Sequence, residues 1–131
     1  MSENRTRPES PDPIAIIGMS LRVPGAKSPE QLWENLVSGT DSITHFRKED
    51  LDFPEEFDQE GYVPARGIVE GIENFDASFF GILPKEAEIM DPQQRLFLEL
   101  AWEVVERAGY AASRIDHRVG VYAGTYMNSY L

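Results

Sequence analysis

Two histidines are the first residues in this sequence that could serve in acid–base chemistry or bind a metal. They are His45 and His117, and each lies in a predicted loop with no second histidine at helical or hairpin spacing. Catalytic and metal-binding histidines usually act together with a nearby partner. We therefore interpret both as surface residues and predict no metal site.

The sequence shows no recognisable nucleophile motif. The sequence contains no cysteine, which excludes a cysteine nucleophile, a thiolate metal site and a disulfide framework within these 131 residues. It also lacks a glycine-rich phosphate loop and the Gly-x-Ser-x-Gly pattern of a nucleophile elbow. Carboxylates are plentiful, but nothing in their spacing brings two of them to one pocket. The sequence therefore predicts no catalytic residue.

Length and charge limit the classes of protein that fit. A chain of 131 residues with 41% apolar residues suits one globular domain with a sizeable core. Its net charge of −11 disfavours nucleic acid and anionic membranes as partners. Residues 1–12 are polar and predict a disordered leader without a signal peptide, followed by a domain over residues 13–131. No apolar stretch is long enough to span a bilayer, so we expect a cytoplasmic protein.

The acidic charge is concentrated between Lys48 and Glu60. We interpret this stretch as a solvated loop, with a docking patch for a cationic partner as the alternative. Its seven acids, against the single Lys48, are Glu49, Asp50, Asp52, Glu55, Glu56, Asp58 and Glu60.

Two apolar runs, and two predicted helices with clear start and end signals, would position any functional site. The runs at residues 14–19 and 119–124 do not alternate with polar residues, which predicts buried strands. The first helix is predicted over residues 28–39, with Ser28 as its cap and Gln31 completing a capping box. The second is predicted over residues 91–109, with so wide an apolar face that we expect it to be covered on most sides. Weaker signals predict a short helix after Pro84 and an edge strand or hairpin near residues 66–71.

The start of the second helix is the most distinctive motif. In Asp91-Pro92-Gln93-Gln94-Arg95, the Asp can cap the helix, the Pro suits its first position and a polar turn follows. We interpret these five residues as a structural motif whose last three side chains hydrogen-bond to neighbouring loops or to a dimer partner.

The apolar runs, the helix starts and several loops together resemble the N-terminal portion of β-ketoacyl synthases, especially the ketosynthase domains of modular polyketide synthases. The resemblance covers nearly everything after Pro13. It is carried by residues 14–19, 22–26, 32–34, 39–41, 75–82, 90–96 and 120–124.

The resemblance implies the N-terminal part of a thiolase-like layered α/β/α fold, incomplete in this chain, and usually a homodimer. It implies a decarboxylative Claisen condensation between a Cys-bound acyl chain and a malonyl unit. That unit arrives on the phosphopantetheine arm of an acyl carrier protein, and no cofactor is bound directly. The family's Cys and His motifs do not occur in this sequence. The resemblance therefore implies a fragment that is inactive by itself and needs the remainder of the domain.

Two functional questions stay open. Tyr126, Met127 and Asn128 follow a predicted strand end, where α/β sheets tend to place ligands. In related synthases this segment contributes to the acyl tunnel, so we take these three residues as acyl-pocket candidates, with ordinary core packing as the alternative. The second question is whether the chain is instead a non-catalytic interaction module, which would pair with a separate ketosynthase chain or dock a carrier protein.

Overall fold

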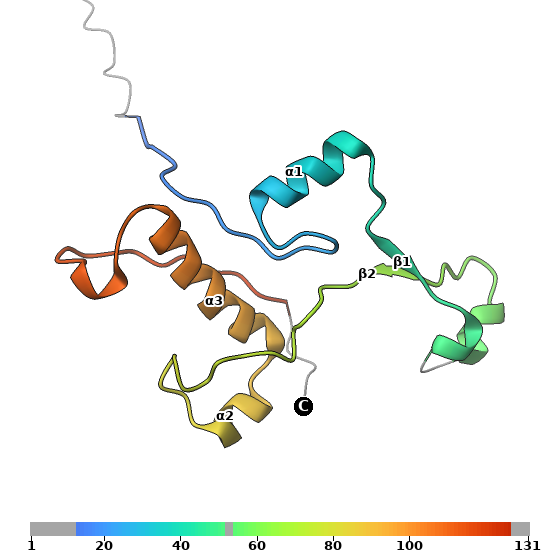
Figure 1. The fold of residues 1–131 in the computed structure, drawn as a ribbon. Helices are drawn as coiled ribbons and strands as arrows, with labels where there is room; N and C mark the ends of the chain where they lie inside the picture. Colours follow the sequence, from blue (N-terminus) through green and yellow to red (C-terminus); the bar gives the residue numbers. More distant parts are fainter. Residues whose placement is uncertain (1–12, 52–53, 127–131) are drawn as a thin grey trace, which may run out of the picture.

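Helix α3 (Pro92–Arg107) is the longest element of the chain and lies near its middle in space (Figure 1). The computed structural model describes residues 13–51 and 54–126. The other regular elements are α1 (Pro29–Ser38), β1 (Ile43–His45), β2 (Ala65–Gly67) and α2 (Pro84–Ile89), with 3₁₀ turns η1 (Lys48–Asp50), η2 (Pro54–Asp58) and η3 (Ala112–Arg114). The predicted leader, residues 1–12, lies outside the described residues.

Helix α1 begins and ends where its capping residues predict. The Ser28 hydroxyl accepts a hydrogen bond from the Gln31 N–H at 3.2 Å, and Gly39 takes a left-handed conformation with φ 69°. The capping box differs from the prediction in one bond. The Gln31 side chain accepts from the backbone N–H of Lys27, at 2.9 Å, rather than from that of Ser28. The side chain thus ties down the residue before the cap and stabilises the turn entering the helix.

The apolar stripe of α1 faces solvent. Trp33 is 68% exposed, and Leu36 and Val37 are also largely exposed. An amphipathic helix derives most of its stability from burying its apolar face. The orientation of α1 therefore depends on contacts other than apolar packing.

Of the edge strand or hairpin predicted near residues 66–71, only a short strand at Ala65–Gly67 forms, and residues 68–71 lie outside it. This strand pairs antiparallel with β1, with Ile43 opposite Gly67 and His45 opposite Ala65. Strand β1 was not predicted, because three residues give too short an alternation of apolar and polar side chains to detect. The loop prediction for His45 is therefore wrong, although its side chain is exposed as expected.

The two predicted buried strands do not form among the described residues. Residues 14–19 and 119–124 lie in no strand, and Ile14 and Tyr122 are 96% and 97% exposed. An apolar run can form a strand only when a neighbouring strand satisfies its backbone N–H and C=O groups. The prediction of two buried strands is therefore wrong for this structure.

Burial is slight throughout the described chain. Of the described residues only Ala26, Asp91 and Arg95 are buried, and Phe97 and Trp102 on α3 remain more than a third exposed. The predictions of a sizeable core and of an α3 covered on most sides are therefore wrong here. The described residues cover the apolar surface of α3 only in part.

A small aromatic cluster covers one side of α3. The Phe79 ring meets Trp102 edge-on with centroids 4.7 Å apart, and the Phe80 ring stands 5.0 Å from Phe79. Phe75 stacks on Phe80 at 5.3 Å. These spacings suit favourable aromatic pairs. The three phenylalanines form one cluster that is only partly buried, and it attaches the loop before α2 to α3.

An ion network joins α1 to α3. The Arg107 guanidinium donates to both carboxylate oxygens of Glu30, at 3.0 and 3.1 Å. Arg107 also pairs with Glu103 at 3.3 Å, as its helical spacing predicts, and Glu103 in turn meets Arg22 at 2.9 Å. The hydrogen bonds from Arg107 are the largest cause that lowers the pKa of Glu30 to about 2. These ion pairs, rather than packing of the exposed apolar stripe, therefore fix the orientation of α1 on α3.

This network predicts an acid-sensitive contact between α1 and α3. The native pKa of Glu30 lies below the 4.5 expected of a free glutamate, so the stabilisation is complete above pH 4.5 and is lost as the pH falls towards 2. NMR titration of the Glu30 carboxyl should give a midpoint near 2. In Arg107→Gln the midpoint should move up towards 4.5. A Glu30 midpoint near 4.5 in the unaltered chain would contradict the network.

Helix α2 begins without a side-chain cap, because a leucine side chain at the cap position offers no hydrogen-bond acceptor. Leu83 occupies the cap position, makes no capping hydrogen bond and is largely exposed. A serine there would offer a hydroxyl to an unpaired N–H of the first turn. We predict that Leu83→Ser stabilises the chain by about 1 kcal/mol relative to Leu83→Ala, measured by chemical denaturation. Equal stability of the two variants would refute this.

Candidate functional site

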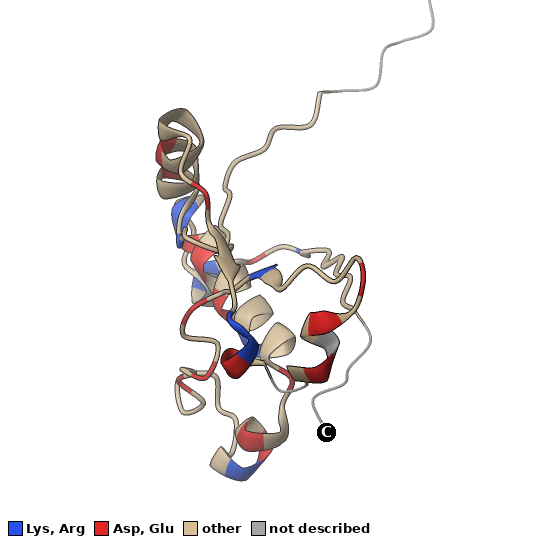
Figure 2. Cartoon of the chain, turned by 90° about the vertical axis from the view of Figure 1, so that its right-hand side faces the viewer, with Lys and Arg blue, Asp and Glu red and all other residues tan. Residues whose placement is uncertain are grey.

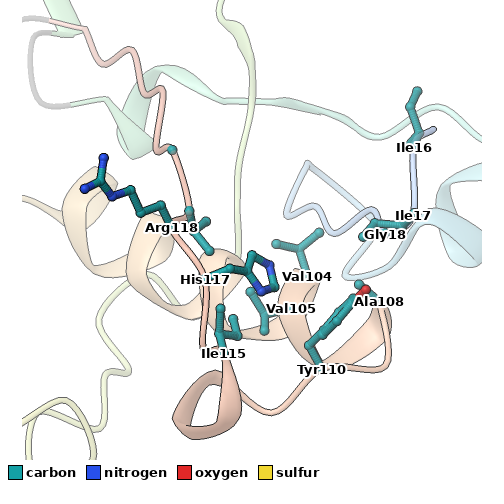
Figure 3. Close-up of a pocket in the computed structure, with 12 residues that line it drawn as sticks. Ile16, Ile17, Gly18, Val104, Val105, Ala108, Tyr110, Ile115, His117 and Arg118 are labelled. Carbon is teal, nitrogen blue, oxygen red and sulfur yellow. The ribbon is translucent and has the colours of Figure 1, made fainter. Parts of the chain in front are cut away.

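An apolar groove runs along α3 between the N-terminal segment and residues 117–122. Two adjoining hollows of about 500 and 560 Å³ form it, and both are lined by Gly18, Val104, Val105, Val119 and Gly120. Figure 3 shows Val104, Val105 and Ala108 projecting from the helix into the first hollow. The groove has the volume to hold an apolar chain or further side chains of a folded domain.

One wall of the groove approaches α3 closely. At Gly18, an added Cβ would lie only 2.7 Å from the carbonyl oxygen of Val104. Any side chain there would push the N-terminal segment away from the helix. Two residues further, the Ser20 hydroxyl donates to the Leu100 carbonyl at 2.8 Å. A glycine and a short polar side chain thus seat the segment on α3.

The groove carries little chemistry of its own. His117 lines the first hollow, is mostly exposed and lies 3.3 Å from the Asp116 carboxylate, whereas His45 lies on β1 and does not line the groove. Within the described part of the chain no group of three or more His, Asp or Glu residues could hold a metal ion. No helix in that part is long and apolar enough to cross a membrane. The groove is suited to packing rather than to acid–base catalysis.

A polar corner closes the N-terminal end of α3. Asp91 is only 5% exposed, and its Oδ1 accepts from the Gln93 N–H at 2.8 Å, which confirms the predicted cap. Its Oδ2 accepts from the Gln93 side-chain Nε2 at 3.3 Å. Arg95, 7% exposed, donates from Nε to the Met90 carbonyl at 2.9 Å. The corner therefore places three polar side chains in a fixed arrangement.

The corner reaches the predicted acyl-pocket segment. The Gln93 Oε1 accepts a hydrogen bond from the backbone N–H of Tyr126 at 3.1 Å. The Tyr126 side chain is largely exposed, and Met127 and Asn128 lie outside the described residues. Of the candidates that the sequence singled out, the structure thus brings Gln93 and Tyr126 together. Pro92 occupies the first helical position, and Gln94 is exposed on the first turn.

The acidic stretch forms a separate, solvated surface. Figure 2 shows Asp and Glu residues on the short turns after β1. Arg47 pairs with Glu49 and Asp50, and Lys48 pairs with Asp58. The hydrogen bonds from Arg47 hold the pKa of Asp50 below its ordinary value. Internal cations thus neutralise part of the charge, as in a solvated loop.

Comparison with known proteins places the whole described chain in one family. The family model "Beta-ketoacyl synthase, N-terminal domain" matches residues 11–131. The spectinabilin polyketide synthase system protein NorA' of Streptomyces orinoci is 48% identical over 94% of this chain, and polyketide synthase PksN of Bacillus subtilis is 43% identical over 91%. The solved ketosynthase from module 1 of the bacillaene synthase of Bacillus amyloliquefaciens superposes with a TM-score of 0.62 and 46% identity over 73% of this chain.

The chain corresponds to a small part of these proteins. It spans 2% of PksN, 3% of NorA' and 17% of the module 1 ketosynthase chain. Its helices and small sheet are the N-terminal part of the thiolase-like α/β fold of ketosynthases, as the sequence predicts. The ordered motifs, the caps and the structural match agree, and the chain belongs to the β-ketoacyl synthase family as the N-terminal portion of a polyketide synthase ketosynthase domain.

Proposed function

We propose that these residues form the N-terminal scaffold of a ketosynthase that catalyses decarboxylative Claisen condensation of acyl and malonyl thioesters. The condensation requires a thiolate nucleophile, which the 131 residues do not contain. The nucleophile and its histidines therefore come from the rest of the domain. The malonyl substrate reaches the enzyme on the phosphopantetheine arm of an acyl carrier protein, and the working enzyme is a homodimer.

The observation that carries this proposal is the uncovered apolar surface beside α3. Ile14, Ile16, Val121 and Tyr122 are all largely exposed on the two segments that border the groove. Exposed apolar surface of this extent marks a place where another part of a fold or a partner packs. The relatives and the solved ketosynthase extend far beyond the matched residues, so the remainder of the domain is the natural cover.

Within this scaffold we assign residues 91–95 a structural role and residues 126–128 a place in the acyl pocket. The cap at Asp91 and the bond from Tyr126 to Gln93 support both assignments.

An interaction module is the second candidate function. The solvated acidic stretch would favour it, because a carrier-binding or pairing surface needs accessible charge. A module of this kind should be a sharply folded monomer by itself. The exposed stripe of α1 and the slight burial of the described chain weigh against this, because both leave apolar surface in water.

A chimeric ketosynthase tests the first proposal. The described residues of this chain would replace the aligned part of the bacillaene module 1 ketosynthase, whose remaining sequence supplies the nucleophile. We expect the purified chimera to be acylated by an acyl thioester, as detected by intact-mass spectrometry, because the scaffold fits the same domain. The 131-residue chain alone should stay unmodified, since it offers no thiolate.

Two controls separate the candidates. A chimera carrying Gly18→Val should lose loading, because the added side chain clashes with the Val104 carbonyl that seats the segment. A chimera that folds but never loads would refute the ketosynthase proposal. A strong near-UV circular dichroism spectrum from the isolated chain, together with its binding to a separately expressed carrier protein, would instead establish the interaction module.

A further inference from the structure

Helix α1, the β1–β2 sheet and the turn at residues 23–27 lie to one side of α3 and form an arm (Figure 1). The Asn35 side-chain amide donates to the Gly25 carbonyl at 2.8 Å, which holds the turn against α1. The turn also lies close to β2, because a Cβ added at Gly67 would stand only 2.6 Å from Cγ of Pro24. Contacts within the arm therefore join its helix, its turn and its sheet into one body.

Charged side chains connect this arm to α3. The Arg107 guanidinium on α3 binds both carboxylate oxygens of Glu30 on α1. On the same helix Glu103 pairs with Arg107 and with Arg22, and Arg22 donates to the Lys27 carbonyl in the turn at 2.7 Å. These contacts reach the arm at two points. The backbones of α1 and α3 do not approach each other as those of packed helices do, although both helices are described in full.

The connecting ion pairs lie near the surface. The side chains of Arg22, Glu103 and Arg107 are 24%, 26% and 34% exposed, and that of Glu30 is 67% exposed. Ion pairs in contact with water stabilise a fold weakly, and dissolved salt screens them. The apolar stripe of α1, which could have added packing, faces solvent. The arm is therefore held on α3 by contacts that a change in ionic strength can weaken.

We propose that the chain of ion pairs Glu30–Arg107–Glu103–Arg22 is an electrostatic latch, which docks the arm on α3 at low ionic strength and releases it at high ionic strength. The arm moves as one body on release, because its internal contacts do not depend on the latch. The backbone near Arg22 and Ile68, where the arm joins the rest of the chain, absorbs the motion. The latch makes the position of the exposed α1 stripe depend on the ionic surroundings. This inference does not depend on the proposed ketosynthase function.

Distances between spin labels test the latch in the 131-residue chain. The sequence has no cysteine, so labels attach only where cysteines are introduced. Val37→Cys on α1 and Gln94→Cys on α3 place one pair across the latch, both at exposed positions. Val37→Cys with Thr44→Cys on β1 gives a control pair inside the arm.

Salt should act on the first distance and not on the second. Raising the salt from about 0.1 M to about 1 M shortens the screening length from about 10 Å to about 3 Å. We expect one narrow distance across the latch at low salt. At high salt the population at this distance should fall severalfold, as expected for partly exposed ion pairs. The distance inside the arm should stay narrow at both concentrations.

Charge variants identify the ion pairs that are responsible. Glu30→Gln and Arg107→Gln should release the arm already at low salt. Glu34→Gln is the matched control, because it removes the same charge from an exposed position on the same helix, and it should change nothing. Exchanging the charges, in Glu30→Arg with Arg107→Glu, should restore the narrow distance at low salt. Far-UV circular dichroism should stay unchanged throughout, since the Ser28 cap of α1 is intact in every variant.

Several outcomes would overturn the latch. A cross-latch distance that is insensitive to salt and to Arg107→Gln would show that packing holds the arm. A broad distance in the unaltered chain at low salt would show that the arm is not docked. Equal broadening inside the arm would indicate melting rather than release, and no rescue by the exchanged charges would exclude the Glu30–Arg107 pair. None of these measurements involves acyl loading, so they are independent of the test of the ketosynthase proposal.

Discussion

The apolar surface of α3 is the constraint on which the rest of the structure depends. Each described segment near the helix meets it by a different contact: Gly18 approaches the Val104 carbonyl, Ser20 bonds to the Leu100 carbonyl and Phe79 packs on Trp102. Its charged and polar side chains reach further, to Glu30 on α1 and to the backbone of Tyr126. These contacts locate the segments but bury little apolar area, so hydrophobic stabilisation of the described chain is small. The helix acts as a support whose apolar surface is covered only in part by the described residues.

Local signals made much of this structure predictable. The caps at Ser28 and Asp91, the left-handed Gly39 and the uncapped Leu83 all follow from interactions within a few residues of the chain. The runs at residues 14–19 and 119–124 failed as predictions for a physical reason. An apolar run indicates that a segment will be buried but does not specify its neighbour, and a strand requires one. Strand β1 was not predicted at all. It has a neighbour, β2, but its three residues are too few to show a pattern of alternating apolar and polar side chains.

The two segments of the candidate site were predictable from the sequence, but the contact between them was not. The sequence singled out residues 91–95 by their capping pattern and residues 126–128 by their position after an apolar run. The bond between Gln93 and Tyr126 joins these two sets, and no periodicity links residues 33 positions apart. The cap bond itself was predictable, because an N-cap carboxylate accepts from the second or third N–H of its helix, here that of Gln93. The partner of the Gln93 side chain was not predictable, because it lies in a distant segment of the chain.

The proposed division of labour between scaffold and chemistry follows from these contacts. A condensing nucleophile must lie within hydrogen-bond reach of its base, and a misplacement of about 1 Å can cost a large factor in rate. The walls that hold the acyl chain face a different demand, since they set which chain fits without taking part in bond making. Backbone anchored to a capped helix meets that demand well, because the cap, the proline and the glutamine are all specified within three consecutive residues. Here the anchor is the bond from the Tyr126 N–H to the Gln93 side chain, which ties the segment after residues 119–124 to the start of α3.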